Sequence, residues 1–269
     1  MVVASSYTSI GPPITVSCGG IINPCSSPHL AQSPIAGGIS NTCNIEYVSA
    51  GVTYPCSTAP AKFSTVSKGD VIVVALDTYA DLLQHTTNGW NSVTITDSLG
   101  SSYTQAIGKC SSQFPSSWKT SYDPNKCSAI YYATVPSTGM DTVTVVLNSA
   151  PQKPSNDIVF DFYMFDVKGI TTTGACIASG SGYSSSMTTT TSCPTSDYFL
   201  IATFGLGHTD TPTNCPGSPP YCGGFTLSFP GNQFNFSIYS TSGVNTPTYF
   251  PATIPTPDNW IEVAAAFTC

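Results

Sequence analysis

Apolar residues recur along this chain in short runs, and no stretch of about ten residues shows the period of an amphipathic helix. The runs either alternate apolar and polar positions or stay apolar over roughly four to eight residues, as β-strands do. Val71–Leu76 is a continuous apolar run after a turn at Lys68–Asp70, whereas Ser92–Thr96 alternates and leads into a turn at Asp97–Gly100. The pattern therefore predicts strands joined by tight turns.

About ten such segments follow one another at short, even spacing, bounded by Gly, Pro, Asn or Asp. They are residues 71–76, 92–96, 101–107, 129–133, 142–147, 158–165, 198–204, 225–229, 234–239 and 260–267. Short strands at this spacing are typical of packed antiparallel sheets. We therefore expect an all-β fold, an antiparallel β-sandwich of jelly-roll type, that occupies residues 61–269 as one domain.

Residues 1–60 differ from the rest of the chain because they are rich in Pro, Gly, Ser and Cys and contain only short apolar pieces. A segment this long without regular structure must be held by disulfides, by the sandwich or by a neighbouring molecule. We expect an N-terminal arm over residues 1–17 and a disulfide-pinned, Cys/Pro/Gly-rich extension over residues 18–60.

The arm starts with a β-prone segment that has no partner nearby in the sequence and ends at Gly11–Pro13. In strand-exchange polymers such an arm completes the sheet of the next subunit and covers an otherwise open edge. Pairing with the chain's own sandwich is the alternative. The candidate donor strand consists of Val2, Val3, Ala4, Ser5, Ser6, Tyr7, Thr8, Ser9 and Ile10.

The chain has eleven cysteines and no arginine, and only 8% of its residues are charged. Thiols in this number indicate an oxidising compartment, so the sequence predicts an extracellular or cell-surface location. Spacing suggests four local disulfides, the last three in loops between strands, although sequence alone does not fix connectivity. The expected pairs are Cys43–Cys56, Cys110–Cys127, Cys176–Cys193 and Cys215–Cys222. Cys18, Cys25 and Cys269 stay unassigned, and one of them is expected to be free or bonded to another chain.

Seven lysines face fourteen acidic residues, which gives a net charge of −7. Without a basic patch, nucleic acid and anionic membrane surfaces are poor partners. No run of about 18 apolar residues is present, so no membrane span is expected. A surface of Ser, Thr, Asn and Gly with few charges is suited to packing against copies of the same chain, although secreted acidic proteins often share this composition.

Residues that could carry catalysis are few, and no enzyme activity is expected. No G-x-S-x-G motif marks a nucleophilic serine. Glycoside hydrolysis needs two carboxylates across a cleft. Asp161 and Asp166 lie on one predicted strand at an odd separation, so they should face opposite sides. The remaining candidates are the only glutamates and histidines of the chain, namely Glu46, Glu262, His29, His85 and His208.

No metal site or cofactor is expected. The cysteines include no C-x₂-C pair, and no histidine lies within a few residues of two cysteines, which argues against zinc. Asp77 and Asp81 could bind calcium together with loop carbonyls, but no D-x-D-x-D pattern supports such a site. We expect Asp97 to cap the Asp97–Gly100 turn through an Asx hydrogen bond.

Surface glycans are conceivable partners because the chain has fourteen tyrosines and three tryptophans. In a β-sandwich most of these side chains belong to the core or to cross-strand pairs. Trp118 is the best exposed candidate because it lies between Cys110 and Cys127. Asn235 begins an N-glycosylation sequon, Asn-Phe-Ser, within a predicted strand.

Several strand and turn motifs occur in a fixed order along the chain. They are Gly69-Asp70 before an apolar strand, Val93–Thr104, Ile130–Ala133, Thr142–Val145, a strand that ends in Asp166–Gly169, and the closing strand Trp260–Phe267. Over about residues 62–269 this order resembles a recurrent module of microbial secreted and surface-associated proteins. The resemblance implies a jelly-roll-like sandwich on a cell surface and implies no catalytic residues.

These observations favour a structural role over chemistry. The leading hypothesis is a subunit of an extracellular filament or cell-surface assembly, a homopolymer built by N-terminal strand donation. The alternative is a cell-surface carbohydrate-binding adhesin module, and a weaker alternative is a secreted hydrolase.

Overall fold

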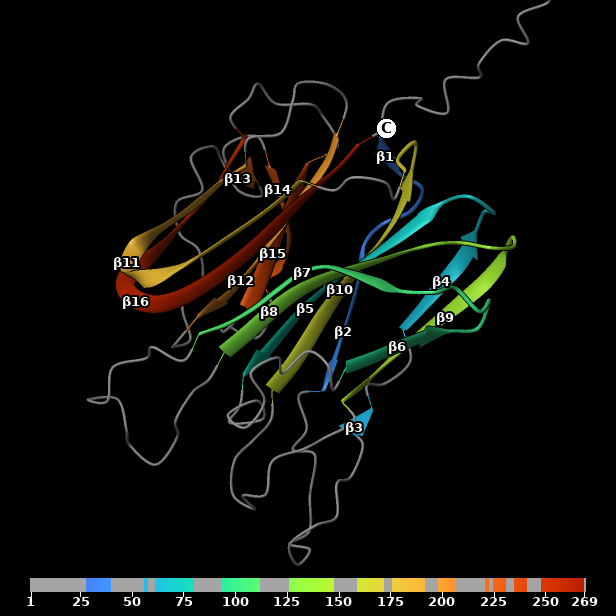
Figure 1. Cartoon of the computed structure of the whole chain (residues 1–269), viewed down its shortest axis with the longest axis horizontal. Helices are drawn as coiled ribbons and strands as arrows, with labels where there is room; N and C mark the ends of the chain where they lie inside the picture. Colours follow the sequence, from blue (N-terminus) through green and yellow to red (C-terminus); the bar gives the residue numbers. More distant parts are fainter. Residues whose placement is uncertain are drawn as a thin grey trace, which may run out of the picture.

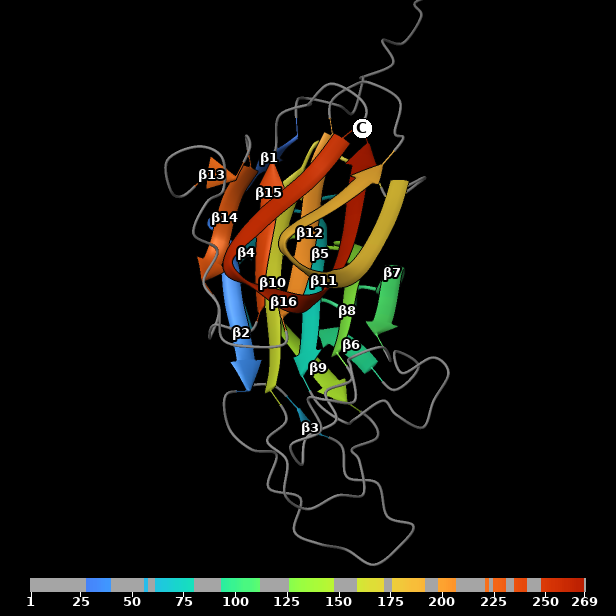
Figure 2. The same ribbon diagram turned by 90° about the vertical axis from the view of Figure 1, so that its left-hand side faces the viewer.

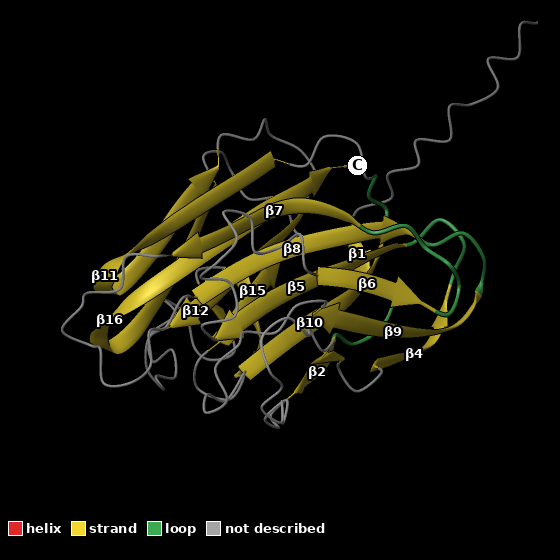
Figure 3. Ribbon diagram, turned by 60° about the horizontal axis from the view of Figure 1, so that its bottom comes forward, coloured by secondary structure: helices red, strands yellow, loops and turns green. Residues whose placement is uncertain are grey.

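The computed structural model describes residues 28–39, 56–57, 61–79, 93–111, 126–147, 159–171, 176–191, 198–206, 221–222, 225–230, 235–240 and 248–268. Within these ranges every regular element is a strand and all pairings are antiparallel (Figure 3). The predicted all-β, antiparallel fold is therefore confirmed, and its jelly-roll connectivity stays a prediction. None of the described residues forms a helix long and apolar enough to cross a membrane.

In the described part of the chain, sixteen strands make up three sheets, which we call the central, small and outer sheets. The central sheet contains β1 (His29–Leu30), β2 (Ile35–Ile39), β5 (Val71–Tyr79), β7 (Thr104–Ser111), β8 (Lys126–Thr134) and β10 (Val159–Lys168). The small sheet contains β3 (Cys56–Ser57), β4 (Ala61–Val66), β6 (Val93–Asp97) and β9 (Gly139–Leu147). The outer sheet contains β11 (Cys176–Thr191), β12 (Tyr198–Leu206), β13 (Tyr221–Cys222), β14 (Phe225–Pro230), β15 (Asn235–Ser240) and β16 (Thr248–Thr268).

The central sheet is covered on both faces, with the small sheet on one side and the outer sheet on the other (Figure 1). Even-numbered β5 residues such as Val74 pack against Phe63 and Val145 of the small sheet. Odd-numbered β5 residues such as Val73 pack against Phe199 and other outer-sheet residues. Because side chains alternate along a strand, a strand buried on both faces is apolar throughout. This double burial explains the continuous apolar run that begins β5.

A third core forms on the far face of the outer sheet. There β11 and β16, which are 16 and 21 residues long, pair along their lengths and curve together (Figure 2). Their pairing shifts register between Ser184 and Ser186, as at a β-bulge. The bend places Met187 and Ile254 in one buried cluster with Phe204 of β12. This pair of strands thus folds over the sheet to which it belongs.

A tight cross-strand contact between β11 and β16 joins Gly182 and Trp260, which lie directly opposite each other. A Cβ atom at position 182 would lie 3.3 Å from Cζ2 of the indole ring. The indole Nε1 donates a hydrogen bond to Ser184 Oγ at 3.0 Å. Glycine therefore leaves room for the ring to lie across the strand.

Gly182→Val should lower the free energy of unfolding by about 1 to 3 kcal/mol, because the added methyl groups must displace the indole. Urea unfolding followed by circular dichroism measures this loss. Ser181→Val is the matched control, since Ser181 is exposed on the same strand. Equal unfolding midpoints for the two variants would show that packing of the Trp260 indole does not require a glycine at position 182.

The extension adds strands to the body of the fold. Residues 28–39, which belong to the predicted extension, pair with β10 through β1 and β2. β3, which lies at the end of the same extension, pairs with β9. The arm, including the candidate donor strand Val2–Ile10, lies outside the described residues.

The predicted Cys110–Cys127 disulfide is confirmed, but its predicted location in a loop between strands is wrong. Cys110 lies in β7 directly opposite Cys127 in β8, and the two Cα atoms are 4.0 Å apart. Antiparallel strands approach this closely at non-hydrogen-bonded pairs, so a disulfide fits there without displacing a ladder hydrogen bond.

The other cysteines are only partly described. Cys176 is disulfide-bonded and is the first residue of β11, again within a strand rather than a loop. Cys56 and Cys222 lie in β3 and β13. The remaining cysteines lie outside the described residues, namely Cys18, Cys25, Cys43, Cys193, Cys215 and Cys269.

Candidate functional site

Among the described residues, buried polar side chains gather at three places. Burying such groups is unfavourable unless they are hydrogen-bonded or paired, so each cluster needs a physical account. The first joins Asp70 and Asp166, the second joins Asp77, Ser128 and Thr203, and the third lies around Asp141. Asp258 and Glu262 are also buried, on β16.

The first cluster is built on the turn between β4 and β5. Gly69, at φ 91°, donates its backbone N–H to the Val135 carbonyl at 2.9 Å. The predicted turn is confirmed. Only glycine takes such a backbone conformation without strain, which explains why a glycine lies at position 69. Asp70 closes the turn because its Oδ2 accepts the Ser67 N–H at 2.9 Å. The Asp70 carboxyl is thereby held close to the end of β10.

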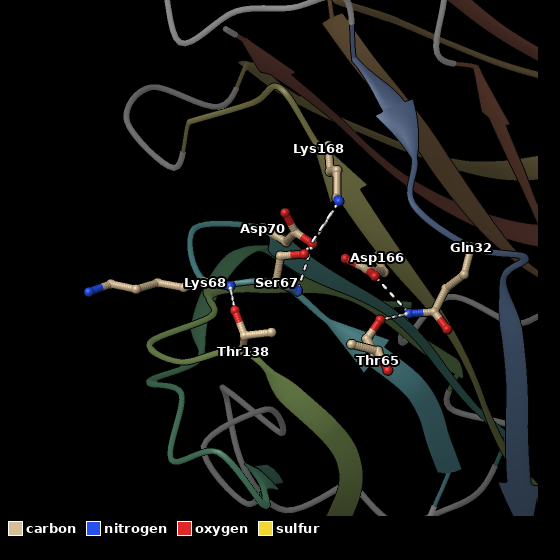
Figure 4. A network of polar contacts seen from close by, with 8 residues as sticks. All are labelled: Gln32, Thr65, Ser67, Lys68, Asp70, Thr138, Asp166 and Lys168. Atoms are coloured by element: carbon tan, nitrogen blue, oxygen red, sulfur yellow. Dashed lines mark hydrogen bonds and ion pairs between the residues drawn. The ribbon is translucent and has the colours of Figure 1, made fainter.

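Gln32 joins three segments at this cluster (Figure 4). Its side-chain Nε2 donates to Asp166 Oδ2 of β10 at 2.7 Å and to the Thr65 carbonyl of β4 at 2.9 Å. Its Oε1 accepts hydrogen bonds from the Ser64 N–H and hydroxyl at 3.3 and 3.1 Å. One amide side chain therefore fastens the segment between β1 and β2 to both the central and the small sheet.

The Asp70 and Asp166 carboxyl groups point toward each other, and Lys168 approaches them from β10 (Figure 4). The Lys168 Nζ lies 3.9 Å from Asp70 Oδ2 and 3.4 Å from Ser67 Oγ. Burial raises the pKa of Asp166 to about 6. The Gln32 hydrogen bond and the Lys168 charge oppose this rise, whereas the Asp70 charge and a hydrogen bond to Asp70 add to it. The Asp166 Oδ1 is buried without a hydrogen-bond partner among the described residues, and a proton bound below about pH 6 would let it donate to the Asp70 carboxylate.

Two carboxyls that share a proton also occur in acid–base catalysis, where a substrate must reach them. Asp166 is fully buried and Asp70 is 6% exposed. The pair is therefore closed to a substrate in this conformation. The arrangement instead supports a structural role, in which the protonation state of Asp166 affects how firmly the segment 31–34 is held to the body of the fold.

The second cluster links the central and outer sheets through the Asp77 carboxyl of β5. Ser128 of β8 donates its hydroxyl to Asp77 Oδ1, and Thr203 of β12 donates its hydroxyl to Oδ2. All three residues are fully buried. The calcium site considered at Asp77 finds no support in this placement, because Asp77 lies within a strand of the core.

The third cluster surrounds the turn after β6. Asp97 Oδ1 accepts the Leu99 and Ser101 N–H groups at 3.0 and 2.9 Å, which confirms the predicted Asx cap. Asp97 Oδ2 accepts the Tyr103 hydroxyl at 3.0 Å. Ser98 donates its hydroxyl to Asp141 Oδ1 at 3.2 Å. The turn is thus tied to β9.

Those candidate catalytic residues that the structure describes lie apart on different strands or along one strand. His29 is exposed on β1, whereas Glu262 is buried on β16. Asp161 and Asp166 both lie on β10, and Asp161 is opposite Asp77 in the strand register. Asn235 is the first residue of β15. The remaining candidates lie outside the described residues, namely Glu46, Asp81, His85, Trp118 and His208.

Metal-binding clusters of the zinc type require several His, Cys, Asp or Glu side chains around one point. Within the described ranges no three such side chains are grouped in that way. Comparison of the chain with protein-family models, with curated proteins and with solved structures finds no match, so function has to be inferred from the chain's own residues.

Proposed function

We propose that this protein is a structural subunit of an extracellular filament or cell-surface assembly, in which the N-terminal arm of one copy adds a strand to the next copy. The observation that carries the proposal is the edge strand β11. It is 16 residues long, forms one end of the outer sheet and contains neither a charged residue nor a proline. Within the described part of the chain, no strand pairs with its outer edge.

Edge strands of monomeric proteins are usually short or protected by charges, prolines or bulges, because an open edge recruits other strands. β11 has one register shift, between Ser184 and Ser186, and Ile177 and Tyr183 on its first half are 51% and 59% exposed. A β-prone segment such as residues 2–10 has the length and composition to pair there. The edge and the arm are therefore suited to each other.

The extracellular location is part of the proposal and is supported by the disulfides at Cys110, Cys127 and Cys176. Such bonds persist in oxidising compartments. The proposed role is non-enzymatic. It is supported by the described buried carboxyls, which accept hydrogen bonds from neighbouring segments and so hold parts of the fold together. The adhesin and hydrolase alternatives have no described site that favours them.

Deleting residues 1–13 should abolish assembly, because the donor strand is removed while every described strand is kept. Negative-stain microscopy and sedimentation of the purified protein measure this result. Monomers that circular dichroism shows to be folded are expected. Polymers formed by the truncated protein would contradict strand donation.

A second pair of variants tests the acceptor edge. Ile177→Lys and Tyr183→Lys should reduce assembly, because charges on an edge strand disfavour strand addition. Met140→Lys is the control, since Met140 is 64% exposed on β9, away from β11. If all three variants assembled alike, β11 would not be the acceptor.

A further inference from the structure

Two carboxyls lie on the inner face of the small sheet, at the end of β6 and in β9. Asp97 pairs with Val143 across the strands, and Asp141 precedes Val143 by two positions on β9. Cross-strand partners and residues two apart share a face. Because Val143 is fully buried in the core between the small and central sheets, both carboxyls are directed toward that core.

Oxygen atoms at this place are left without hydrogen bonds. Asp141 is fully buried, and its Oδ1 accepts the Ser98 hydroxyl, but its Oδ2 has no hydrogen-bond partner among the described residues. The Ser101 Oγ is likewise buried without a partner in that part of the chain. Ser101 belongs to the same turn, because its N–H binds Asp97 Oδ1 at 2.9 Å. Such orphaned buried atoms in a native fold need an explanation, of which a bound ion is one.

Among the described residues, no cationic side chain pairs with the Asp97 or Asp141 carboxylate. The ion pair seen among the described residues, Lys168–Asp70, lies at the other acidic cluster. The Tyr103 hydroxyl donates to Asp97 Oδ2 at 3.0 Å and brings no charge to the cluster. A bound cation would be coordinated by the unpartnered Asp141 Oδ2 and Ser101 Oγ atoms. Its charge would also offset the repulsion between the Asp97 and Asp141 carboxylates.

We propose that Asp97, Asp141 and Ser101 form a binding site for one calcium ion. All three offer oxygen atoms, which hard cations such as calcium prefer. Two carboxylates balance its double charge. Magnesium demands near-octahedral geometry and keeps several waters, for which the buried Asp141 leaves little room. Calcium accepts irregular sets of carboxylate, hydroxyl and carbonyl oxygens, and the turn at 97–101 supplies these.

Isothermal titration of the full chain, stripped with a chelator, tests the site with calcium chloride and with magnesium chloride at equal ionic strength. We expect one calcium ion per chain and weaker binding of magnesium. At calcium concentrations about a hundredfold above the Kd, the Tm should rise by about 5 °C or more. No calcium binding by the wild-type protein would overturn the proposal.

Variants locate the ion. Asp141→Asn keeps an acceptor for Ser98 and removes the charge, so it should bind calcium at least tenfold more weakly and should have a higher Tm than the wild type without calcium. Asp166→Asn is the matched control and should bind as the wild type does. If Asp141→Asn bound calcium with unchanged affinity, the proposed site would be wrong.

Terbium luminescence gives a second measurement that does not depend on stability. Terbium replaces calcium at oxygen sites and is excited by a nearby tyrosine, so the bound ion should emit through Tyr103. Tyr103→Phe should lose most of this emission while terbium remains bound. Emission unchanged in both Tyr103→Phe and Asp141→Asn would place terbium elsewhere and contradict the assignment.

Discussion

Replacing Asp77 with alanine should lower the free energy of unfolding by about 3 to 4 kcal/mol, one of the largest effects expected for a single side chain here. The Asp77 carboxyl accepts hydroxyls from Ser128 in its own sheet and from Thr203 in the outer sheet. Both hydroxyls are fully buried. Without Asp77 they lose this acceptor in the core, and a small cavity is added.

Two matched variants separate the lost hydrogen bonds from the lost volume. Asp77→Asn keeps one carbonyl acceptor and the side-chain size, so it should be destabilised by less than Asp77→Ala. Combining Asp77→Leu with Ser128→Ala and Thr203→Val removes every member of the cluster and should recover much of the stability. Urea unfolding of the variants provides the comparison. A loss below about 1 kcal/mol for Asp77→Ala would show that the hydrogen bonds of this cluster do not stabilise the packing of the outer sheet on the central sheet.

Most of the core strands could be predicted from the sequence because their apolar residues report their burial. The run 71–76 is apolar at every position, as a strand between two covered faces must be. The turns at Gly69 and Asp97 were predictable because each depends on local chemistry, a positive φ in one case and an Asx hydrogen bond in the other. Local signals of this kind survive any tertiary arrangement.

β11 and the first half of β16 could not be predicted, and the reason is physical. β11 is rich in Ser, Thr and Gly and has no apolar alternation, because its outer edge and one face are largely open. The first half of β16 contains Pro251, Pro255 and Pro257, which usually argue against a strand. These two segments form strands because they pair with each other. The sequence pattern of neither segment indicates this pairing.

The buried clusters were also beyond sequence patterns, because their members come from distant segments. Gln32, Asp70 and Asp166 meet only after β10 pairs with β5 and with the extension. One signal was available: a carboxyl inside an apolar strand, as at Asp166, is unfavourable unless a partner compensates it. Such a residue marks a polar cluster even when its partners are unknown.

Through Asp166, the stability of the folded chain should fall as the pH rises from about 4 to above 6. The pKa of Asp166 is raised from 3.8 to about 6 in the folded state. Between these values the folded chain holds a proton that the unfolded chain has lost, so the free energy of unfolding decreases with increasing pH. The contribution is complete below about pH 4, is lost through pH 6 and amounts to at most about 3 kcal/mol.

Asp166→Asn isolates this contribution from the other carboxyls. Asparagine can accept the Gln32 amide and donate to Asp70, as the protonated aspartic acid does, but it does not titrate. Unfolding free energies of the two proteins between pH 4 and 8 should agree near pH 4, diverge in favour of the variant as the pH rises from about 4 to 6, and differ by a constant amount above pH 6. Lys168→Met should move the divergence to higher pH, because the Lys168 charge lowers the pKa of Asp166. A constant difference across the range would mean that Asp166 keeps no proton in the fold.

The location of the effect can be measured directly, because Gln32 connects Asp166 to the segment that leads into β2. When Asp166 ionises, its repulsion with Asp70 strains the contact that holds this segment. Amide hydrogen exchange of residues 35–39, corrected for the intrinsic pH dependence, should therefore speed up from pH 5 to pH 7. Asp166→Asn should abolish the change. Exchange that accelerates equally in β8, on the other side of β5, would instead indicate global loss of stability and not a local fastening.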